Sequence, residues 1–321
     1  MRLGRFDPLA TALAWRLRWH YVRSRKEHAA SPRTTWPSTS DDVDGSLLRL
    51  AIVVVNFNTA RLISQLLFSL YRILGRSEFA TVVVVDNGST DGSRQILESL
   101  AAAGLIQLVA NADQQYHGPA LTQGVSWLAD RQESASPADR IRYVWTLDSD
   151  VVVLRRETAR DALAAFEGTN AAAVGQSQGN PVTRRALRKN PTMLSPFSMI
   201  LDPVQLWQPS IPPFVEDGAP ATSMQLAADA DGLRLVSFPF VEDGYLIHLG
   251  RGTLRSIAES RDTTNRYYEW AASHNEPYYM GQEGAPVLYE RFCAVFDDEV
   301  GDLSPERVTA ACSASDLLSL R

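Results

Sequence analysis

Short apolar runs alternate with longer segments of helical spacing between residues 48 and 150. The runs LRLAIVVV, ATVVVV and IQLVAN have the length of strands, and each is followed by a turn and a segment that can form a helix. Strands that are almost wholly apolar and alternate with helices are typical of a parallel sheet covered on both faces. We therefore expect an α/β chain with a mostly parallel, Rossmann-like nucleotide-binding sheet and helices on both faces.

Polar side chains follow each of these strands at the point where the apolar run ends. In a parallel sheet these ends meet at one edge, and ligands bind beyond them. The sequence therefore predicts a ligand site there, formed by Asn56, Asn58, Asp86, Asn87, Asp91, Asp148 and Asp150.

Asp148 and Asp150 interrupt the stretch YVWTLDSDVVVL, which otherwise reads as one continuous apolar strand. Side chains two positions apart on a strand point to the same side, roughly 7 Å apart. Two buried carboxylates without partners would be costly, and a divalent cation with oxygen ligands is the usual solution. Two further D-x-D pairs, at 42–44 and 229–231, lie in polar or turn-like sequence, where we expect them to be solvated.

Composition and missing motifs exclude several classes of protein. The chain is 45% hydrophobic and 21% charged, as in soluble globular proteins, and no apolar run approaches the eighteen or so residues that span a bilayer. Two cysteines form no disulfide framework and the N-terminus lacks a signal-peptide pattern, so we expect a cytoplasmic protein. No G-x-G-x-x-G or P-loop pattern follows a strand, so phosphate has to be bound in another way.

The N-terminal arm, residues 1–28, differs in charge from the rest of the chain. Residues 1–26 carry a local charge of +6 within a net −6, which leaves an acidic remainder of −12 that disfavours nucleic-acid binding. The arm mixes Trp, Leu and Arg at helical spacing, a composition that suits peripheral contact with the inner face of a membrane. A helix docked on the protein's own surface and a frayed arm are the alternatives. Residues 29–47 read as a linker.

Three motifs together resemble a known family. VVVNFNTARLISQLLFSL, VVVVDNGSTDGSRQIL and VWTLDSDVVVL are similar to segments of the GT-A-fold glycosyltransferases of family 2, which transfer a sugar from a nucleotide-sugar with inversion. The resemblance spans residues 48–255, which we divide into a nucleotide-sugar half, 48–150, and an acceptor and metal half, 151–255. We expect residues 256–321 to form a C-terminal helical extension on the acceptor side.

The resemblance implies a role for each motif residue. Asn56 and Asp86 would help to hold the nucleotide base, and Asp148 would contact the ribose or the metal. Asp150 would ligate the metal, and His248 would bind the metal or the diphosphate. The donor-binding set also takes in the neighbouring strand-end residues Asn58, Asn87 and Asp91.

The catalytic base implied by the resemblance is Asp217, in the EDG segment before an expected helix. A second VEDG segment makes Asp243 a competitor for this role. We add Arg251 and Thr253 of HLGRGT as donor-binding residues, because a guanidinium and a hydroxyl would offset charge on a departing diphosphate. The chain also departs from its relatives at NADQQYHGPALTQG, which carries His117.

These residues predict a metal-assisted, inverting glycosyltransferase that uses Mn²⁺ or Mg²⁺ and a nucleotide-sugar donor. The acceptor hydroxyl would belong to a carbohydrate, a lipid-linked or a small-molecule acceptor. Two alternatives remain: a sugar nucleotidyltransferase, and a non-catalytic nucleotide-sugar-binding scaffold of the same fold. As a hypothesis, Trp207 and the aromatic stretch at 265–281 line the acceptor site; packing in the core is the alternative.

Overall fold

The computed structural model of the protein describes residue 36 and residues 49–136, 139–178, 187–215, 220–250 and 284–319. The N-terminal arm and all of the linker except Trp36 lie outside these residues, so the three interpretations of the arm stay predictions. Trp36 is buried, and its indole nitrogen donates a hydrogen bond to the carbonyl of Ile141.

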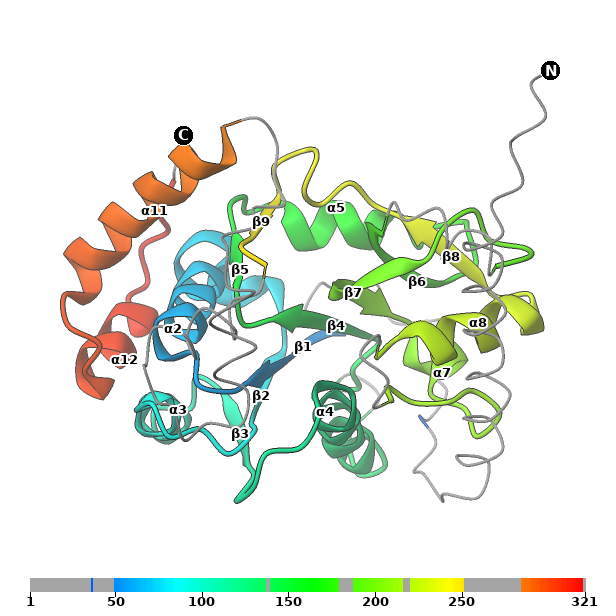
Figure 1. Cartoon of the computed structure of the whole chain (residues 1–321), viewed down its shortest axis with the longest axis horizontal. Coiled ribbons are helices and arrows are strands. Elements are labelled where there is room, and N and C mark those ends of the chain that lie inside the picture. Colours follow the sequence, from blue (N-terminus) through cyan, green and yellow to red (C-terminus); the bar gives the residue numbers. More distant parts are fainter. Residues whose placement is uncertain are drawn as a thin grey trace, which may run out of the picture.

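A seven-stranded mixed sheet forms the centre of the molecule (Figure 1). Its strand order is β3-β2-β1-β4-β7-β6-β8, with four parallel and two antiparallel pairings. The strands are β1 (Leu50–Asn56), β2 (Thr81–Asp86), β3 (Gln107–Ala110), β4 (Tyr143–Asp148), β6 (Ala171–Ser177), β7 (Leu194–Leu201) and β8 (Arg234–Ser237). The expected mostly parallel α/β sheet is confirmed.

Helices cover both faces of this sheet because alternate residues of β1 enter two different apolar clusters. Leu50, Ile52 and Val54 pack in the cluster with α2 (Ala60–Ser69) and α3 (Ser93–Ala102). Ala51 and Val53 pack in the cluster with α4 (His117–Gln132), α7 (Pro203–Leu206) and α8 (Thr222–Asp231). A third helix, α5 (Thr158–Ala164), contributes to the first cluster.

The start of α2 is capped by a residue from a neighbouring turn. Thr59 stands at the N-cap position but makes no capping hydrogen bond from its side chain. The carboxylate of Asp91 accepts the hydrogen bond from the Ala60 amide at 2.8 Å instead. The helix continues as a π-helical turn, η2 (Leu70–Gly75), followed by a 3₁₀ turn, η3 (Arg76–Glu78).

A close approach places α4 on the sheet. A Cβ atom on Gly124 would lie 2.6 Å from a methyl carbon of Val53 and 3.1 Å from one of Val85. The missing side chain lets the helix pack directly on β1 and β2. This contact sets the position of the N-terminal turn of α4 above the strand ends.

The stretch YVWTLDSDVVVL does not form one strand. After Asp148 the chain turns, and β5 (Val151–Val153) pairs antiparallel with β9 (Leu246–His248) in a separate two-stranded ribbon. Val151 lies opposite His248 in this ribbon. The two aspartates therefore flank the point where the chain leaves the main sheet for the ribbon.

Asp229 is buried, so the expectation that this D-x-D pair is solvated is wrong for its first member. Its carboxylate accepts hydrogen bonds from the backbone amides of Arg188, Lys189 and Asn190 and from the side-chain amide of Asn190. Asp231 is exposed, as expected. Asp229 thus joins the last turn of α8 to the segment that leads into β7.

Two C-terminal helices, α11 (Ala285–Val300) and α12 (Pro305–Ser313), pack beside α2 and α3 (Figure 1). The ring of Phe68 lies edge-on to Phe292 and Phe296, with ring centroids 6.0 and 5.4 Å away. The buried guanidinium of Arg72 pairs with Glu299 and Asp316. The end of the chain is therefore held on the α2 side of the sheet. No helix among the described residues is long and apolar enough to cross a membrane.

Candidate active site

Asp148, Asp150 and His248 meet at the junction between the main sheet and the ribbon. One oxygen or nitrogen atom from each lies within 4.8 Å of the others. The Nε2 atom of His248 is 3.2 Å from Oδ1 of Asp150 and 3.9 Å from Oδ2 of Asp148. The structure brings these three expected residues together, although His248 lies about a hundred positions downstream of Asp150 in the chain.

The pairing of the ribbon and a ring contact fix the imidazole of His248. Its ring stacks on Phe197 of β7, with centroids 4.0 Å apart and planes inclined by 15°. The Nδ1 atom is buried and has no hydrogen-bond partner within the described chain. This orientation leaves Nε2 directed at the two carboxylates.

Neighbouring opposite charges shift the pKa values of His248 and Asp148. Burial favours the neutral imidazole of His248, but Asp150 and Asp148 outweigh this effect and raise its pKa above the usual value. Burial likewise opposes ionisation of Asp148, but His117 and His248 outweigh it and lower the pKa of that carboxyl. These contacts therefore favour the charged forms of His248 and Asp148 over the neutral forms, and a divalent cation beside Asp148 would favour its carboxylate in the same way.

His117 also reaches this cluster, from the first turn of α4. Its Nε2 atom lies 3.4 Å from Oδ1 of Asp148, whereas His248 faces the other oxygen. Burial alone would lower the pKa of His117, but contact with Asp148 raises it. The sequence marked His117 as a departure from the family pattern, but the spacing between residues 117 and 148 contains no signal of this contact.

A chain of buried hydrogen bonds connects the end of β1 with the turn between the aspartates. Thr59 donates to Oδ1 of Asn56 at 2.7 Å, and its hydroxyl lies 3.1 Å from that of Ser149. The side-chain amide nitrogen of Asn56 donates to the side chains of Asp86, Ser89 and Ser93. Asn56 and Asp86 are fully buried, so a direct contact with a nucleotide base would require them to exchange partners.

Arg94 of α3 completes the surroundings of Asp86. Its guanidinium lies 2.7 Å from Oδ2 of Asp86 and also donates to the carbonyl of Asn111. Asn87 exchanges hydrogen bonds with the backbone of Gln115, whose carbonyl accepts at 2.6 Å and whose amide donates at 2.9 Å. These contacts hold the loop after β3 against the end of β2.

Asn58 and Asp91 form hydrogen bonds between the turn after β1 and the turn after β2. The side-chain oxygen of Asn58 accepts from the amide of Thr90 at 2.7 Å, and its backbone adopts a positive φ of 51°. Asp91 accepts from the amide and hydroxyl of Ser93 as well as from Ala60. In this structure both residues join the turns after β1 and β2, which is the capping role that Asp and Asn often play.

The expected base Asp217 and the expected diphosphate contacts Arg251 and Thr253 lie outside the described residues. The chain on either side of Asp217 is placed: the amide of Val215 donates to the carbonyl of Pro220. The first turn of α4 packs on this point, because a Cβ on Gly118 would lie 2.1 Å from the Val215 carbonyl oxygen. Thr122 adds a hydrogen bond to the carbonyl of Phe214.

Two other candidates have clear surroundings. Trp207 is buried in the apolar cluster with α4 and α8, which favours the packing alternative over an acceptor platform. Asp243 is exposed in the turn before β9, and Leu246–His248 leads from that turn back to the cluster of Asp148, Asp150 and His248. The aromatic stretch at 265–281 lies outside the described residues.

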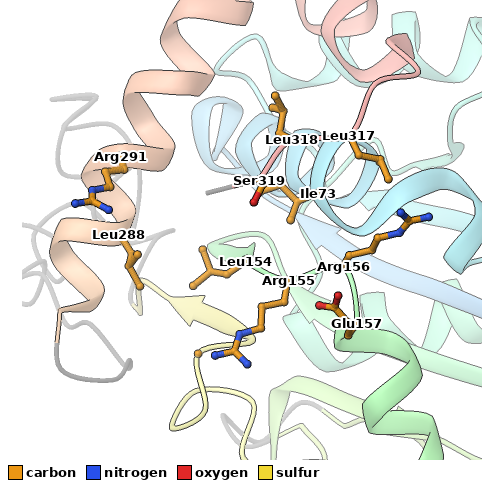
Figure 2. Close-up of a pocket in the computed structure, with 11 residues that line it drawn as sticks. Ile73, Leu154, Arg155, Arg156, Glu157, Leu288, Arg291, Leu317, Leu318 and Ser319 are labelled. Atoms are coloured by element: carbon orange, nitrogen blue, oxygen red, sulfur yellow. The ribbon is translucent and has the colours of Figure 1, made fainter. Parts of the chain in front are cut away.

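A cavity of about 520 Å³ lies at the opposite end of the ribbon from His248, and Figure 2 shows its lining. Leu154, Leu288 and Leu318 contribute apolar surface. The guanidinium groups of Arg155, Arg156 and Arg291 point in different directions, so they do not converge on one anion (Figure 2). No residue of the Asp148 cluster lines this cavity.

The residues of the cluster fit a divalent cation. Two carboxylates and one imidazole supply hard oxygen ligands and one nitrogen, a set that suits Mn²⁺ or Mg²⁺. Oδ1 of Asp148 and Nδ1 of His248 are buried without hydrogen bonds among the described residues, so this polar cluster is not satisfied internally.

The sequence profile of Glycosyl transferase family 2 matches residues 51–219, which is more than half of the chain. The chain belongs to glycosyl transferase family 2. Family 2 membership confirms the resemblance from which the GT-A fold was expected, and it makes this protein a glycosyltransferase by family. The matched range includes both aspartates of the cluster, whereas His248 lies beyond it. No curated protein gives a significant sequence match.

Solved structures similar to this family 2 chain are distant. A mannosyltransferase from Pyrobaculum calidifontis, in complex with GDP-Man and Mn²⁺, is 17% identical with a TM-score of 0.45, covering 96% of this chain and 84% of that one. TarS 1–349 from S. aureus is 20% identical with a TM-score of 0.44, covering 65% and 63%. Glucosyl-3-phosphoglycerate synthase from Mycobacterium tuberculosis, in complex with phosphoglyceric acid, is 19% identical with a TM-score of 0.42, covering 64% and 77%.

Proposed function

We propose that the protein is a metal-dependent, inverting glycosyltransferase that transfers a sugar from a nucleotide-diphosphate sugar to an acceptor hydroxyl. The observation that carries the proposal is the convergence of Asp148, Asp150 and His248 at the end of β4 in a family 2 chain. Family membership supports sugar transfer, and the cluster supports metal assistance.

The cluster would bind the donor through its diphosphate. Asp148, Asp150 and His248 would hold a divalent ion, which when bound supplies Lewis-acid stabilisation of the leaving diphosphate. Ser149 lies between the two aspartates in the sequence, and its hydroxyl is hydrogen-bonded to that of Thr59. This contact stabilises the turn that carries both carboxylates. Preorganised ligands of this kind lower the barrier because they need no rearrangement during the reaction.

Asp217 remains our candidate for the base that takes the proton from the acceptor hydroxyl. The proposal rests on the family resemblance and on the placed chain ends around it, where Val215 and Pro220 are hydrogen-bonded and Gly118 packs on the Val215 carbonyl. A base on the face opposite the leaving group is what inversion requires. Arg251 and Thr253 remain candidates for contact with the diphosphate.

For the nucleotide we propose a role of Asn56, Asn58, Asp86, Asn87 and Asp91 in shaping the base side of the site. Their hydrogen bonds connect the turns that follow β1, β2 and β3 at this edge of the sheet. The acceptor would be a carbohydrate, a lipid-linked or a small-molecule hydroxyl.

The primary test is release of nucleotide from a panel of UDP-, GDP- and dTDP-sugars with Mn²⁺, Mg²⁺ or EDTA. We expect slow hydrolysis of one donor that requires metal and is lost in Asp150→Ala. Asp231→Ala is the matched control, because it removes the exposed carboxylate of the other described D-x-D pair. Donor binding without turnover would favour a scaffold, and formation of a nucleotide-sugar from a sugar phosphate would favour a nucleotidyltransferase.

The catalytic base has to be tested by measuring sugar transfer to an acceptor, because donor hydrolysis does not involve the acceptor hydroxyl. We expect transfer to a panel of aryl glycosides and short oligosaccharides to fall about a hundred- to ten-thousand-fold in Asp217→Asn. Asp243→Asn, in the competing VEDG turn, should stay within a few-fold of wild type. The reverse order would assign the base to Asp243.

A further inference from the structure

Asp148 is held differently from the other two members of the cluster. His248 is fixed by ribbon pairing and by its stack on Phe197, and the backbone carbonyl of Asp150 accepts a hydrogen bond from Leu249 at 3.0 Å. The side chain of Asp148 is the last of its strand, and its Oδ1 atom accepts no hydrogen bond within the described chain. Something else has to set the orientation of this carboxylate.

His117 is placed to do so. Its Nε2 atom lies 3.4 Å from Oδ1 of Asp148, whereas Nε2 of His248 lies 3.9 Å from the other oxygen, Oδ2. The two imidazoles therefore contact different oxygens of the carboxylate. His117 is not a member of the group of atoms that could share one ion.

The imidazole of His117 stands on a firmly placed element. It is the first residue of α4, a helix of sixteen residues. The next residue, Gly118, packs on the Val215 carbonyl, and Gly124 seats the helix on the sheet. These contacts constrain the backbone of this turn, and so the point from which the imidazole extends toward Asp148.

We propose that His117 is a positioning residue for metal binding: it engages Oδ1 of Asp148 and so directs Oδ2 toward the ion shared with Asp150 and His248. The inference rests on the proposed function in taking the cluster as a divalent-metal site. Partners that orient a ligand in this way typically contribute 10- to 100-fold to metal affinity.

The test is the dissociation constant for Mn²⁺ alone, measured on the full chain by the electron paramagnetic resonance of free Mn²⁺. His117→Phe keeps a ring but removes both nitrogens, and we expect it to weaken Mn²⁺ binding about tenfold. His117→Gln keeps an N–H donor of similar reach and should recover affinity to within about threefold of wild type. Tyr116→Phe, at the neighbouring exposed position, is the control for disturbance of this turn, and thermal unfolding checks that each variant folds.

The outcomes separate two hypotheses. Wild-type affinity in His117→Phe would overturn the positioning role while leaving the metal site intact. Equal loss in the Phe and Gln variants would also overturn it, because the imidazole nitrogen itself would then be required. If the wild type binds no Mn²⁺, or Asp150→Ala binds it equally well, the proposed metal-dependent function fails instead.

Discussion

The hydroxyl of Thr59 lies 3.1 Å from that of Ser149, ninety residues further along the chain, and both are buried. Thr59 also donates to Oδ1 of Asn56, so one hydroxyl connects the end of β1 with the turn between Asp148 and Asp150. Hydrogen bonds therefore connect the sheet edge directly with the turn that carries the two aspartates.

Replacing Thr59 with Val should break this connection while keeping the shape of the side chain. Oδ1 of Asn56 would be left buried without its donor, and we expect a loss of about 1–3 kcal/mol in the free energy of unfolding, measured by urea denaturation. Metal-dependent donor hydrolysis should fall as well. Thr169→Val, which removes a hydroxyl bonded to Ala165 and Phe166 far along the chain, should leave hydrolysis unchanged.

Gly118→Ala should disturb the site through the backbone. The new Cβ would lie 2.1 Å from the Val215 carbonyl oxygen, so α4 or the chain before Asp217 must move. We expect about 1–3 kcal/mol of destabilisation, measured by thermal unfolding. We also expect a loss of transfer activity, measured as kcat. Gly168→Ala, where a Cβ meets no atom within 4 Å, should cost only the strain of its positive φ, and equal activity in the two variants would contradict this account.

Asp229 should make stability depend on pH in the acid range. Burial opposes its ionisation, but the amides of Arg188, Lys189 and Asn190 outweigh this and lower its pKa. A carboxyl with a lowered folded-state pKa contributes stability above its unfolded pKa of about 3.9, and this is lost as pH falls through the folded value.

Asp229→Asn should therefore be less stable than wild type at pH 7, and the difference should shrink below about pH 4. Urea denaturation at a series of pH values measures it. Asp231→Asn, at the exposed neighbour, should show no such dependence on pH.

Arg72 should determine how firmly the C-terminal helices are held. Its buried guanidinium pairs with Glu299 and Asp316 and donates to the carbonyl of Ala311. Arg72→Met should cost about 1–3 kcal/mol, because the carbonyl of Ala311 loses its donor while the partly exposed acids can turn to water. It should also speed amide exchange in α12.

The matched control is Arg61→Met. Arg61 forms an exposed pair with Asp297 at 2.8 Å, and such pairs contribute about 0–1 kcal/mol. Equal losses of unfolding free energy in the two variants would show that the burial of Arg72 does not increase its contribution to stability.

The sheet, and the placing of polar residues at its strand ends, could be predicted from the sequence because those signals are local. Apolar runs, helical spacing and polar strand ends lie within a few residues of one another, and the Asp148 and Asp150 pair interrupts a strand visibly. The family resemblance then supplied His248, which no local pattern marks as a partner of the pair.

Other features depend on contacts between distant segments. The valines of β5 look like a continuation of β4, and only pairing with β9 shows that they form a separate ribbon. Asp229 resembles any aspartate at a helix end, since the amides that bind it lie about forty residues earlier in the chain. His117 likewise meets Asp148 only after α4 has packed on the sheet.

Asp148 ends a strand of the main sheet, whereas His248 belongs to the ribbon. If our proposal is right, an ion bound by both residues would cross-link the main sheet and the ribbon, which share no strand pairing among the described residues. Chelation should then loosen the ribbon while leaving the sheet intact, so that amide exchange quickens at Val152 far more than at Val144.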